Sequence, residues 1–390
     1  MTAAIPVRAG WRVVPFRDLA QSITERVDDP AASGLDHYVG LEHLDPDTLK
    51  ISRWGAPSDV EATKLRFYPG DVIYARRRAY QRKLGVAKWD GIASAHALVL
   101  RARPEVCLPG FLPYFLQGDQ FHRRALEISV GSLSPTINWT TLAAEEFLLP
   151  PIPEQREIVA VGTAFDSYLE LVGAATARAE ALLESLMQPL AAAPDSVPLT
   201  RLAELQLGRQ RSPAYEMGIR PRPYLRAANL RLDEVDLFDV KQMDFTAAEE
   251  ELYRVRPGDV LLVEGGDPDK VGAPTLVAAD LGPMCIQNTV VRVRGRDDGA
   301  DGRFLYWVMR AAFVAGKFER IATGTKLHHL GLNKLTQFSV PAPTSERQAR
   351  VRQLDTAHET HLRLKELMRT GAEARRLVIN QALEVGARGV

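Results

Sequence analysis

The chain has 390 residues, of which 46% are hydrophobic and 25% charged, and its formal net charge at pH 7 is zero. This length suffices for two or three domains, each with its own core. The composition is typical of a soluble globular protein, and we see no uninterrupted apolar run near the roughly 18 residues of a membrane span and no signal-peptide region. A net charge of zero argues against a protein that binds polyanions non-specifically, but it does not exclude a protein that recognises a specific DNA sequence.

The two cysteines, Cys107 and Cys285, have no nearby Cys or His at metal-binding spacing. We therefore expect reduced core residues, no metal site and a cytoplasmic protein.

Residues 11–150 predict a first α+β domain, because short apolar runs alternate with turns rich in Gly and Pro. Pro69-Gly70-Asp71 is a turn signal that leads into a strand. A helix is expected near 111–127. The expected strands are Ile73-Tyr74-Ala75, Ala97-Leu98-Val99-Leu100 and Phe147-Leu148-Leu149.

A basic loop follows the first of these strands. Residues 76–83 hold five basic side chains, no acid and one aromatic. Arg can bind guanine through two hydrogen bonds, and both Arg and Lys neutralise phosphate. For each residue the alternative is solvated surface charge. The candidate DNA-binding residues of this loop are Arg76, Arg77, Arg78, Tyr80, Arg82 and Lys83.

A long helix is predicted over 153–190, after the proline-rich segment 150–153. Pro153 is tolerated in a first helical turn, and Pro189 marks the end. Apolar or small residues recur in steps of three and four, which is a heptad seam. The seam positions are Ile158, Val161, Phe165, Tyr168, Val172, Ala175, Ala179, Leu182 and Leu186.

The globular pattern then returns at an offset of about 190 residues. Five matches occur in the same order, which predicts an internal duplication longer than any solenoid repeat. A second helix is expected near 302–320. The matches pair Pro15 with Pro198, Tyr38 with Tyr224, Pro69-Gly70-Asp71 with Pro257-Gly258-Asp259, Pro150 with Pro341, and Glu154 with Glu346; the second-copy strands are Val260-Leu261-Leu262-Val263, Thr275-Leu276-Val277 and Thr289-Val290-Val291-Arg292-Val293.

A second long helix with a poorer seam closes the chain. Its seam includes Leu354, Leu364 and Met368, whereas His361, Gly371 and Arg375 interrupt it. Two helices of similar length with one seam each are natural antiparallel partners. We place the interface on Ile158, Val161, Phe165, Val172, Leu182, Leu186, Leu354, Leu364 and Met368. The predicted domains are 1–152 and 191–343, with spacer helices 153–190 and 344–390.

Basic residues occupy other positions in the second copy. The candidates for contact with DNA there are Arg209, Arg211, Arg220, Arg222, Arg226 and Lys326. The stretch 264–270 is acidic and stands where the first copy has Arg76–Arg78. A catalytic site would not become a basic cluster in its own duplicate, so we interpret the stretch as a variable loop. Two domains that recognise different halves of a DNA site would differ in such loops, with basic residues at different positions.

The sequence carries no catalytic motif. The chain has no phosphate-binding Gly-x-x-x-x-Gly-Lys-Ser/Thr loop, no Gly-x-Gly-x-x-Gly turn and no Asn-Pro-Pro-Tyr-like run around a flipped base.

The boundary segment 131–159 resembles that of type I restriction–modification specificity subunits. The resemblance rests on Gly131-Ser132, Ile137-Asn138-Trp139, Leu142 and Phe147-Leu148-Leu149-Pro150-Pro151-Ile152-Pro153-Glu154-Gln155-Arg156-Glu157-Ile158-Val159. The second boundary carries it weakly, and Arg347 stands where the pattern has Gln. The order domain, helix, domain, helix is similar to the family over nearly the whole chain.

The resemblance implies a non-catalytic subunit whose two target-recognition domains each read half of a split site in double-stranded DNA. The helix pair would set the gap and dock two methyltransferase subunits. No cofactor is expected in this chain. S-adenosylmethionine is expected on the methyltransferases, and ATP on a restriction subunit where the system also cuts DNA.

Two alternatives stay open on the residues alone. One is a coiled-coil scaffold that holds two protein-binding domains. The other is a metal-dependent nuclease with its site at Asp267 and Asp269.

Overall fold

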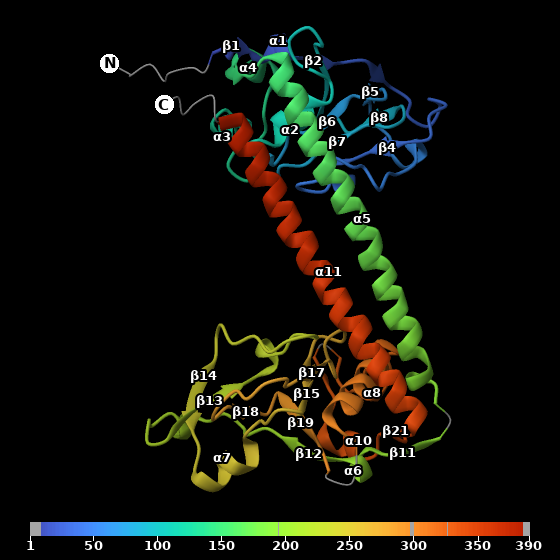
Figure 1. Ribbon diagram of the computed structural model, residues 1–390, viewed down its shortest axis with the longest axis vertical. Coiled ribbons are helices and arrows are strands. Elements are labelled where there is room, and N and C mark those ends of the chain that lie inside the picture. The colour runs from blue at the N-terminus through green and yellow to red at the C-terminus, as the bar shows by residue number, and fades with distance from the viewer. Residues whose placement is uncertain (1–8, 194, 297–299, 326, 385–390) are drawn as a thin grey trace. The chain divides into compact units, whose positions relative to one another are not determined.

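The computed structural model describes residues 9–193, 195–296, 300–325 and 327–384. The chain divides into two compact units, Met1–Ala174 with Leu364–Val390, and Ala175–Arg363. Each unit holds a mixed α/β part and one end of each of two long helices, α5 (Ile152–Ala191) and α11 (Ser345–Glu384) (Figure 1). The predicted α+β class with two long helices is confirmed.

The first unit is built on two four-stranded sheets. One has the order β2-β9-β6-β7 and the other β3-β5-β8-β4, in which only β4 and β8 run parallel. A short antiparallel pair joins β1 to β10, and β10 comes shortly before α5 in the sequence. The strands are β1 (Arg12–Pro15), β2 (Ala20–Ile23), β3 (Arg26–Val27), β4 (Tyr38–Val39), β5 (Lys64–Phe67), β6 (Val72–Ala75), β7 (Leu84–Val86), β8 (Gly91–Ala93), β9 (Ala97–Ala102) and β10 (Glu146–Leu149).

Helices cover the first sheet and close the main core of this unit. The helix expected near 111–127 is present but is divided at Gly118 into α2 and α3. The core is aromatic: Phe121 lies at its centre, with Phe115 and Phe147 at 5.8 and 5.6 Å between ring centroids. The helices are α1 (Phe16–Leu19), α2 (Phe111–Gln117), α3 (Asp119–Glu127) and α4 (Trp139–Ala144), with short 3-10 turns η1 (Leu41–His43), η2 (Pro57–Asp59) and η3 (Ala79–Gln81).

The second unit has a four-stranded sheet of order β12-β19-β15-β17 and a three-stranded sheet of order β14-β13-β18. Two short pairs, β11 with β21 and β16 with β20, complete it. The strands are β11 (Ser196–Pro198), β12 (Ala203–Leu207), β13 (Pro221–Leu225), β14 (Lys241–Asp244), β15 (Val260–Val263), β16 (Gly265–Gly266), β17 (Pro274–Leu276), β18 (Cys285–Ile286), β19 (Val290–Gly295), β20 (His328–His329) and β21 (Ser339–Pro341).

The main core of the second unit lies around α8, which contributes the buried Trp307 and Phe304. The helix expected near 302–320 is divided at Gly316, whose φ of 66° a β-branched or bulky residue would resist. The helices are α6 (Leu199–Leu202), α7 (Ala247–Tyr253), α8 (Gly302–Val314), α9 (Lys317–Ile321) and α10 (Leu332–Thr336), with η4 (Pro213–Tyr215) and η5 (Ala227–Asn229).

The two units share the strand order of one sheet, whereas their second sheets differ in the number and order of strands. The sheet β2-β9-β6-β7 corresponds to β12-β19-β15-β17, and the parallel pair β4–β8 corresponds to β13–β18. The end pairs β1–β10 and β11–β21 correspond in the same way. The equivalent segments are those that the sequence matches align.

The repeated Pro-Gly-Asp turn has one geometry in both units. Gly70 and Gly258 each have φ of 90°, a conformation that glycine adopts at little cost. Asp71 is buried, and Arg101 donates to its two carboxylate oxygens at 2.7 and 2.9 Å. Arg294 donates to the buried Asp259 at 2.7 Å to each oxygen. The motif therefore fixes the entry into the central strand.

Within the first unit, α5 and α11 run antiparallel. Arg375 of α11 forms an ion pair with Asp166 of α5 at 2.7 Å. One turn earlier on α11, Gly371 lies so close to Tyr168 that an added Cβ would be 2.8 Å from its ring. Gly371 and Arg375, which interrupt the apolar seam in sequence, are both buried, as is the third interrupting residue, His361, in the second unit.

Within the second unit, the other ends of the two helices join one core. Leu183 and Met187 of α5 and Leu354 of α11 belong to the same buried cluster. An ion pair links Arg347, in the first turn of α11, to Asp195 just beyond α5.

The predicted seam on α5 needs correction at three positions. Val161, Tyr168 and Leu182 are 40%, 38% and 51% exposed. The neighbours of the first and last, Gly162 and Leu183, are buried instead. A helix with about 3.6 residues per turn drifts away from a strict repeat of 3.5, so the buried stripe shifts by one residue over several turns. Of the other proposed interface residues, Ile158, Val172 and Leu354 are buried, and Phe165, Leu186, Leu364 and Met368 are half-buried.

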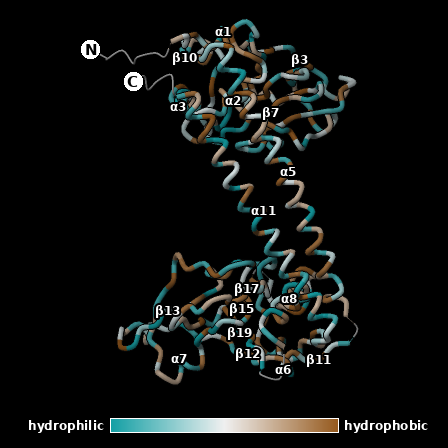
Figure 2. The backbone as a smooth tube through the Cα atoms, viewed as in Figure 1, coloured by the Kyte–Doolittle hydropathy of each residue, from teal (hydrophilic) through white to brown (hydrophobic). Residues whose placement is uncertain are grey.

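By length and composition alone, α5 is apolar enough to cross a membrane, although its sequence has no long uninterrupted apolar run. Figure 2 shows more hydrophobic colour along α5 than along α11. The apolar side of α5 has protein neighbours in both units, because Ile158 belongs to the core of the first unit and Leu190 to that of the second.

Candidate nucleic-acid interface

The basic loop of the first unit connects β6 to β7 and contains η3. The segment 135–138 holds its first half: the Arg78 amide donates to the Pro135 carbonyl at 2.8 Å, and the Ile137 amide donates to the Arg76 carbonyl at 3.0 Å. Ala79, at the centre of the loop, is buried. The loop is therefore fixed to the domain by its backbone, which leaves its longer side chains available.

Three side chains of this loop point to solvent. Arg77, Arg78 and Tyr80 are exposed, and Tyr80 is 51% accessible. Within the described ranges, neither Arg77 nor Arg78 has a side-chain hydrogen bond or an ion pair. Arg76 is half-buried and donates to the Asn138 side-chain oxygen at 3.2 Å. Two arginines without acidic partners on a rigid loop are suited to bind an anion.

The backbone of the loop is strained. Arg78 has φ 58° and ψ 51°, and Arg82 has φ 52° and ψ 31°. Only one further non-glycine residue among those the structure describes has positive φ, namely Asp47. Left-handed backbone at such residues costs on the order of 1–3 kcal/mol and is concentrated at functional sites.

Two of the predicted contact residues have structural partners instead. Arg82 forms an ion pair with Asp119 at 2.6 Å, and Lys83 donates to the Leu41 carbonyl at 3.2 Å. Neither cation is as available as Arg77 or Arg78.

The corresponding loop of the second unit follows β15 and has a different surface. It forms the strand pair Gly265–Gly266 with His328–His329. Its acidic residues have basic neighbours: Glu264 contacts His329 at 3.1 Å, and Lys270 forms an ion pair with Asp267 at 2.7 Å. Among the residues described, no group of three His, Cys, Asp or Glu side chains is arranged to hold a metal ion.

Arg209 needs correction as a candidate surface residue. It is only 8% exposed, and its guanidinium stacks 3.7 Å from the centroid of the Tyr215 ring. It also forms an ion pair with Glu249 at 2.8 Å and donates to the Asp244 carbonyl. Arg209 therefore stabilises the sheet β14-β13-β18 from within.

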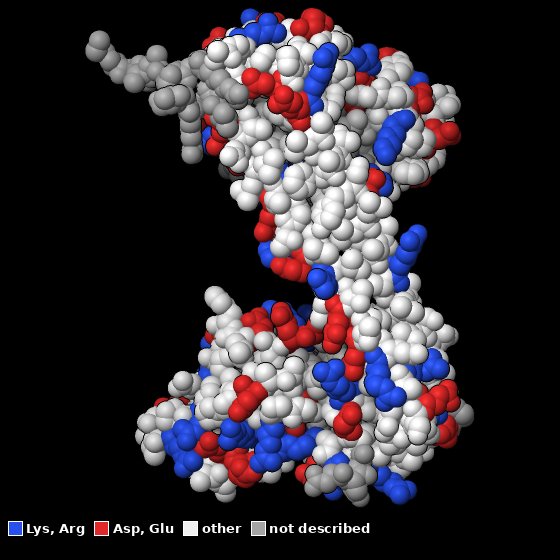
Figure 3. Space-filling view, viewed as in Figure 1, with Lys and Arg blue, Asp and Glu red and all other residues white. Residues whose placement is uncertain are grey.

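The other predicted arginines of the second unit are partly exposed, but each pairs with an acid. Glu250 accepts from both Arg220 and Arg222, at 2.8 and 2.9 Å. These three charges and their neighbours surround β13 and β14, and Figure 3 shows blue and red surfaces side by side in that region. Arg226 pairs with Asp239. Lys326 lies outside the described residues.

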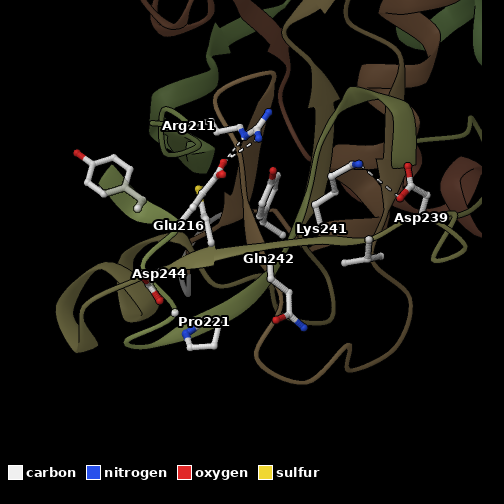
Figure 4. Close-up of a pocket in the computed structure, with 12 residues that line it drawn as sticks. Arg211, Glu216, Pro221, Asp239, Lys241, Gln242 and Asp244 are labelled. Atoms are coloured by element: carbon white, nitrogen blue, oxygen red, sulfur yellow. Dashed lines mark hydrogen bonds and ion pairs between the residues drawn. The ribbon is translucent and has the colours of Figure 1, made fainter. Parts of the chain in front are cut away.

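A cavity of about 490 Å³ lies within this paired-charge region. Figure 4 shows Arg211 directed at Glu216, 2.7 Å apart, and Lys241 directed at Asp239 across the cavity wall. Ile219 and Phe238, which are the sequence neighbours of the lining residues Gly218 and Asp239, are 84% and 98% exposed. Sequence reasoning missed these exposed apolar side chains, since scattered apolar residues in loops carry no periodic signal.

The fold thus defines a class: a protein of two α/β units that share the strand order of one four-stranded sheet, each holding one end of two long helices. No protein-family model matches the chain. The specificity subunit of the Escherichia coli type I restriction enzyme EcoDI is 26% identical over 192 residues, which make up 48% of this chain and 42% of that protein. The match therefore spans less than half of this curated relative.

Two solved structures are similar over almost the whole chain. One, reported for complex assembly and conformational transition of the type I R-M system, has a TM-score of 0.60 at 18% identity and covers 98% of this chain and 99% of that chain. The type I restriction-modification S subunit from M. genitalium has a TM-score of 0.61 at 12% identity, with 98% of each chain covered. These structures confirm the fold, and the curated relative confirms the resemblance to type I specificity subunits.

Proposed function

We propose that this chain is the non-catalytic, DNA-sequence-recognising subunit of a type I restriction–modification system. Each unit would read one half of a split site in double-stranded DNA. The names of the similar proteins support this proposal, as does the shared strand order of the two units, for which we infer an internal duplication.

The observation that carries the DNA-binding proposal is the pair Arg77 and Arg78. Both are exposed, lack acidic partners and lie on a loop whose backbone is held by segment 135–138. A guanidinium that is already positioned loses little conformational entropy when it meets phosphate or the edge of guanine. Tyr80 adds an exposed aromatic surface beside them.

The second unit would read its half-site with different chemistry. Its partly exposed arginines, among them Arg211 and Arg226, already pair with acids, so contact with DNA would have to compete with Glu216 and Asp239. Such competition disfavours non-specific phosphate binding, because an acid near the contact repels DNA unless the correct bases replace it as partner.

The partners follow from the same proposal. Two methyltransferase subunits would dock on the helix pair and bring S-adenosylmethionine, and a restriction subunit would bring ATP where the system cuts DNA. This chain would itself bind no cofactor, and it would act in the cytoplasm. The lengths of α5 and α11, 40 residues each, would set the gap between half-sites.

The test is to bind the assembled methyltransferase complex to its target DNA, with Arg77→Ala/Arg78→Ala in this chain. We expect weaker binding, and a salt dependence that is flatter by about one unit for each phosphate that the chain no longer neutralises. The control is Arg12→Ala/Arg26→Ala, which removes the same charge from exposed positions in the same unit. Equal behaviour of the two variants, or a wild-type complex that does not bind DNA, would instead support the scaffold alternative.

A further inference from the structure

A chain of polar contacts connects the basic loop of the first unit to α11. Arg82, at the end of the loop, forms an ion pair with Asp119 at 2.6 Å. The Asn380 side chain of α11 meets the same aspartate twice: the Asp119 amide donates to Asn380 Oδ1, and Asn380 Nδ2 donates to Asp119 Oδ2, both at 2.8 Å. Asn380 is 9% exposed, whereas the Asp119 side chain is 37% exposed, so these bonds are partly buried.

This network lies at one of the two strained ends of the loop. Arg78 is held by the Pro135 carbonyl, whereas Arg82 follows η3 in left-handed backbone. Strained backbone persists only where its surroundings hold it. At the Arg82 end, two side-chain contacts do so: Lys83 donates to the Leu41 carbonyl, and Arg82 forms an ion pair with Asp119, to which Asn380 is hydrogen-bonded.

Apolar packing does not replace the network at this end. A cavity of about 220 Å³ lies beside it, lined by Gln117, Asn380 and the positive-φ residue Asp47. Both polar atoms of the Gln117 side chain are buried without a hydrogen-bond partner. Since the surrounding space is incompletely filled, removal of the Asn380 hydrogen bonds would let Asp119 and Arg82 move.

We propose that Asn380 and Asp119 are positioning residues for recognition of one half-site, and that Arg82 acts through the loop rather than on DNA. The last turns of α11 thereby act together with segment 135–138 in presenting Arg77 and Arg78. This inference rests on the proposed DNA-binding function, and it makes α11 part of the reading apparatus of the first unit.

The experiment measures binding of the assembled methyltransferase complex to DNA sites altered in one half or the other. Asn380→Ala removes both hydrogen bonds. Asn380→Asp keeps the volume and replaces the donor by a carboxylate that faces Asp119. The matched control is Gln381→Ala, which removes an exposed amide from the next position of the same helix. Thermal unfolding of each variant reports on the fold.

Both Asn380 variants should bind the target about five- to tenfold more weakly, with preference relaxed in one half-site and retained in the other. Gln381→Ala should match wild type. A double-mutant cycle separates positioning from general destabilisation. If Asn380 acts through the loop, Asn380→Ala should add little once Arg77→Ala/Arg78→Ala is present, because the effects of coupled residues are not additive.

Three results would overturn the inference: normal preference in both Asn380 variants, relaxation of both half-sites together, or full additivity with Arg77→Ala/Arg78→Ala. If Asn380→Ala lowers the unfolding temperature strongly, the volume-conserving Asn380→Asp decides. Failure of the proposed function looks different. In that case Arg77→Ala/Arg78→Ala also leaves binding unchanged, whereas failure of the inference alone leaves the effect of that variant intact.

Discussion

Gln155 shows how one residue connects the boundary segment to the fold. It is 1% exposed and sits in the first turn of α5. Its amide nitrogen donates to the Val106 and Pro150 carbonyls at 2.9 Å, and its oxygen accepts from the Leu108 amide at 2.9 Å. In the second unit Arg347 stands at the equivalent position and donates to the Ala342 carbonyl. The arginine therefore also forms a hydrogen bond to the backbone at the start of its helix, although it departs from the sequence pattern.

Replacement of Gln155 by Ala should therefore destabilise the first unit. It leaves one buried and two partly buried backbone groups without this partner, and an unsatisfied buried group costs about 1–3 kcal/mol unless water enters. We expect the free energy of unfolding to fall by at least about 2 kcal/mol in denaturant titrations. Gln188→Ala, an exposed position on the same helix, is the control. Equal stability of the two variants would contradict this role.

The two cysteines should be unreactive in the folded protein. Burial raises the pKa of the Cys107 and Cys285 thiols to about 12 in each case. The thiolate is the nucleophile, so almost none is present at pH 8. A thiol-specific reagent should modify neither residue in the native chain at that pH and both after unfolding in guanidinium. Rapid native labelling of either cysteine would contradict the burial that we describe.

At the scale of elements, sequence patterns predicted whether a segment is a helix or a strand better than they predicted where that element is broken. Apolar runs predicted the strands β6, β9 and β15 because these are buried on both faces, where no alternation is needed. The helices near 111–127 and 302–320 were predicted without their breaks at Gly118 and Gly316. Periodicity reports which residues are buried on average, whereas a break depends on the packing of the following turn.

The same limit applies to the seam of α5, and it yields a sharp test. Leu183 is 4% exposed and belongs to the core of the second unit, whereas Leu182 is 51% exposed. Leu183→Ala should cost about 2–5 kcal/mol of unfolding free energy. Leu182→Ala should cost under about 1 kcal/mol. Denaturant titrations of the two variants decide between the observed stripe and a strict heptad, which would reverse their order.

Functional surfaces were harder to predict than the fold, since exposed charges carry no periodic signal. A run of arginines marked Arg77 and Arg78, but the same reasoning selected Arg209, which packs on Tyr215 in the interior. Whether a basic residue is available depends on acids distant in sequence, such as Glu249. Such a pairing between residues far apart in the chain cannot be predicted from a single sequence.

At the scale of the whole molecule, the account predicts two readers with separate tasks. The units share a strand order yet differ in the loop after the central strand, which is basic after β6 and glycine-rich and acidic after β15. Base contacts in one unit should then determine only one half of the recognised sequence. Removing one hydrogen-bonded pair between a side chain and a base costs about 1–3 kcal/mol of discrimination at that position.

The most direct test is methylome sequencing of cells that carry the complete system with wild-type chain or with Arg77→Ala/Arg78→Ala. The wild type should methylate a split motif of two short sequences separated by a fixed gap. The variant should show degeneracy or loss confined to one side, with the gap unchanged. A wild-type motif that is not split, or equal relaxation of both halves in the variant, would contradict the two-reader account.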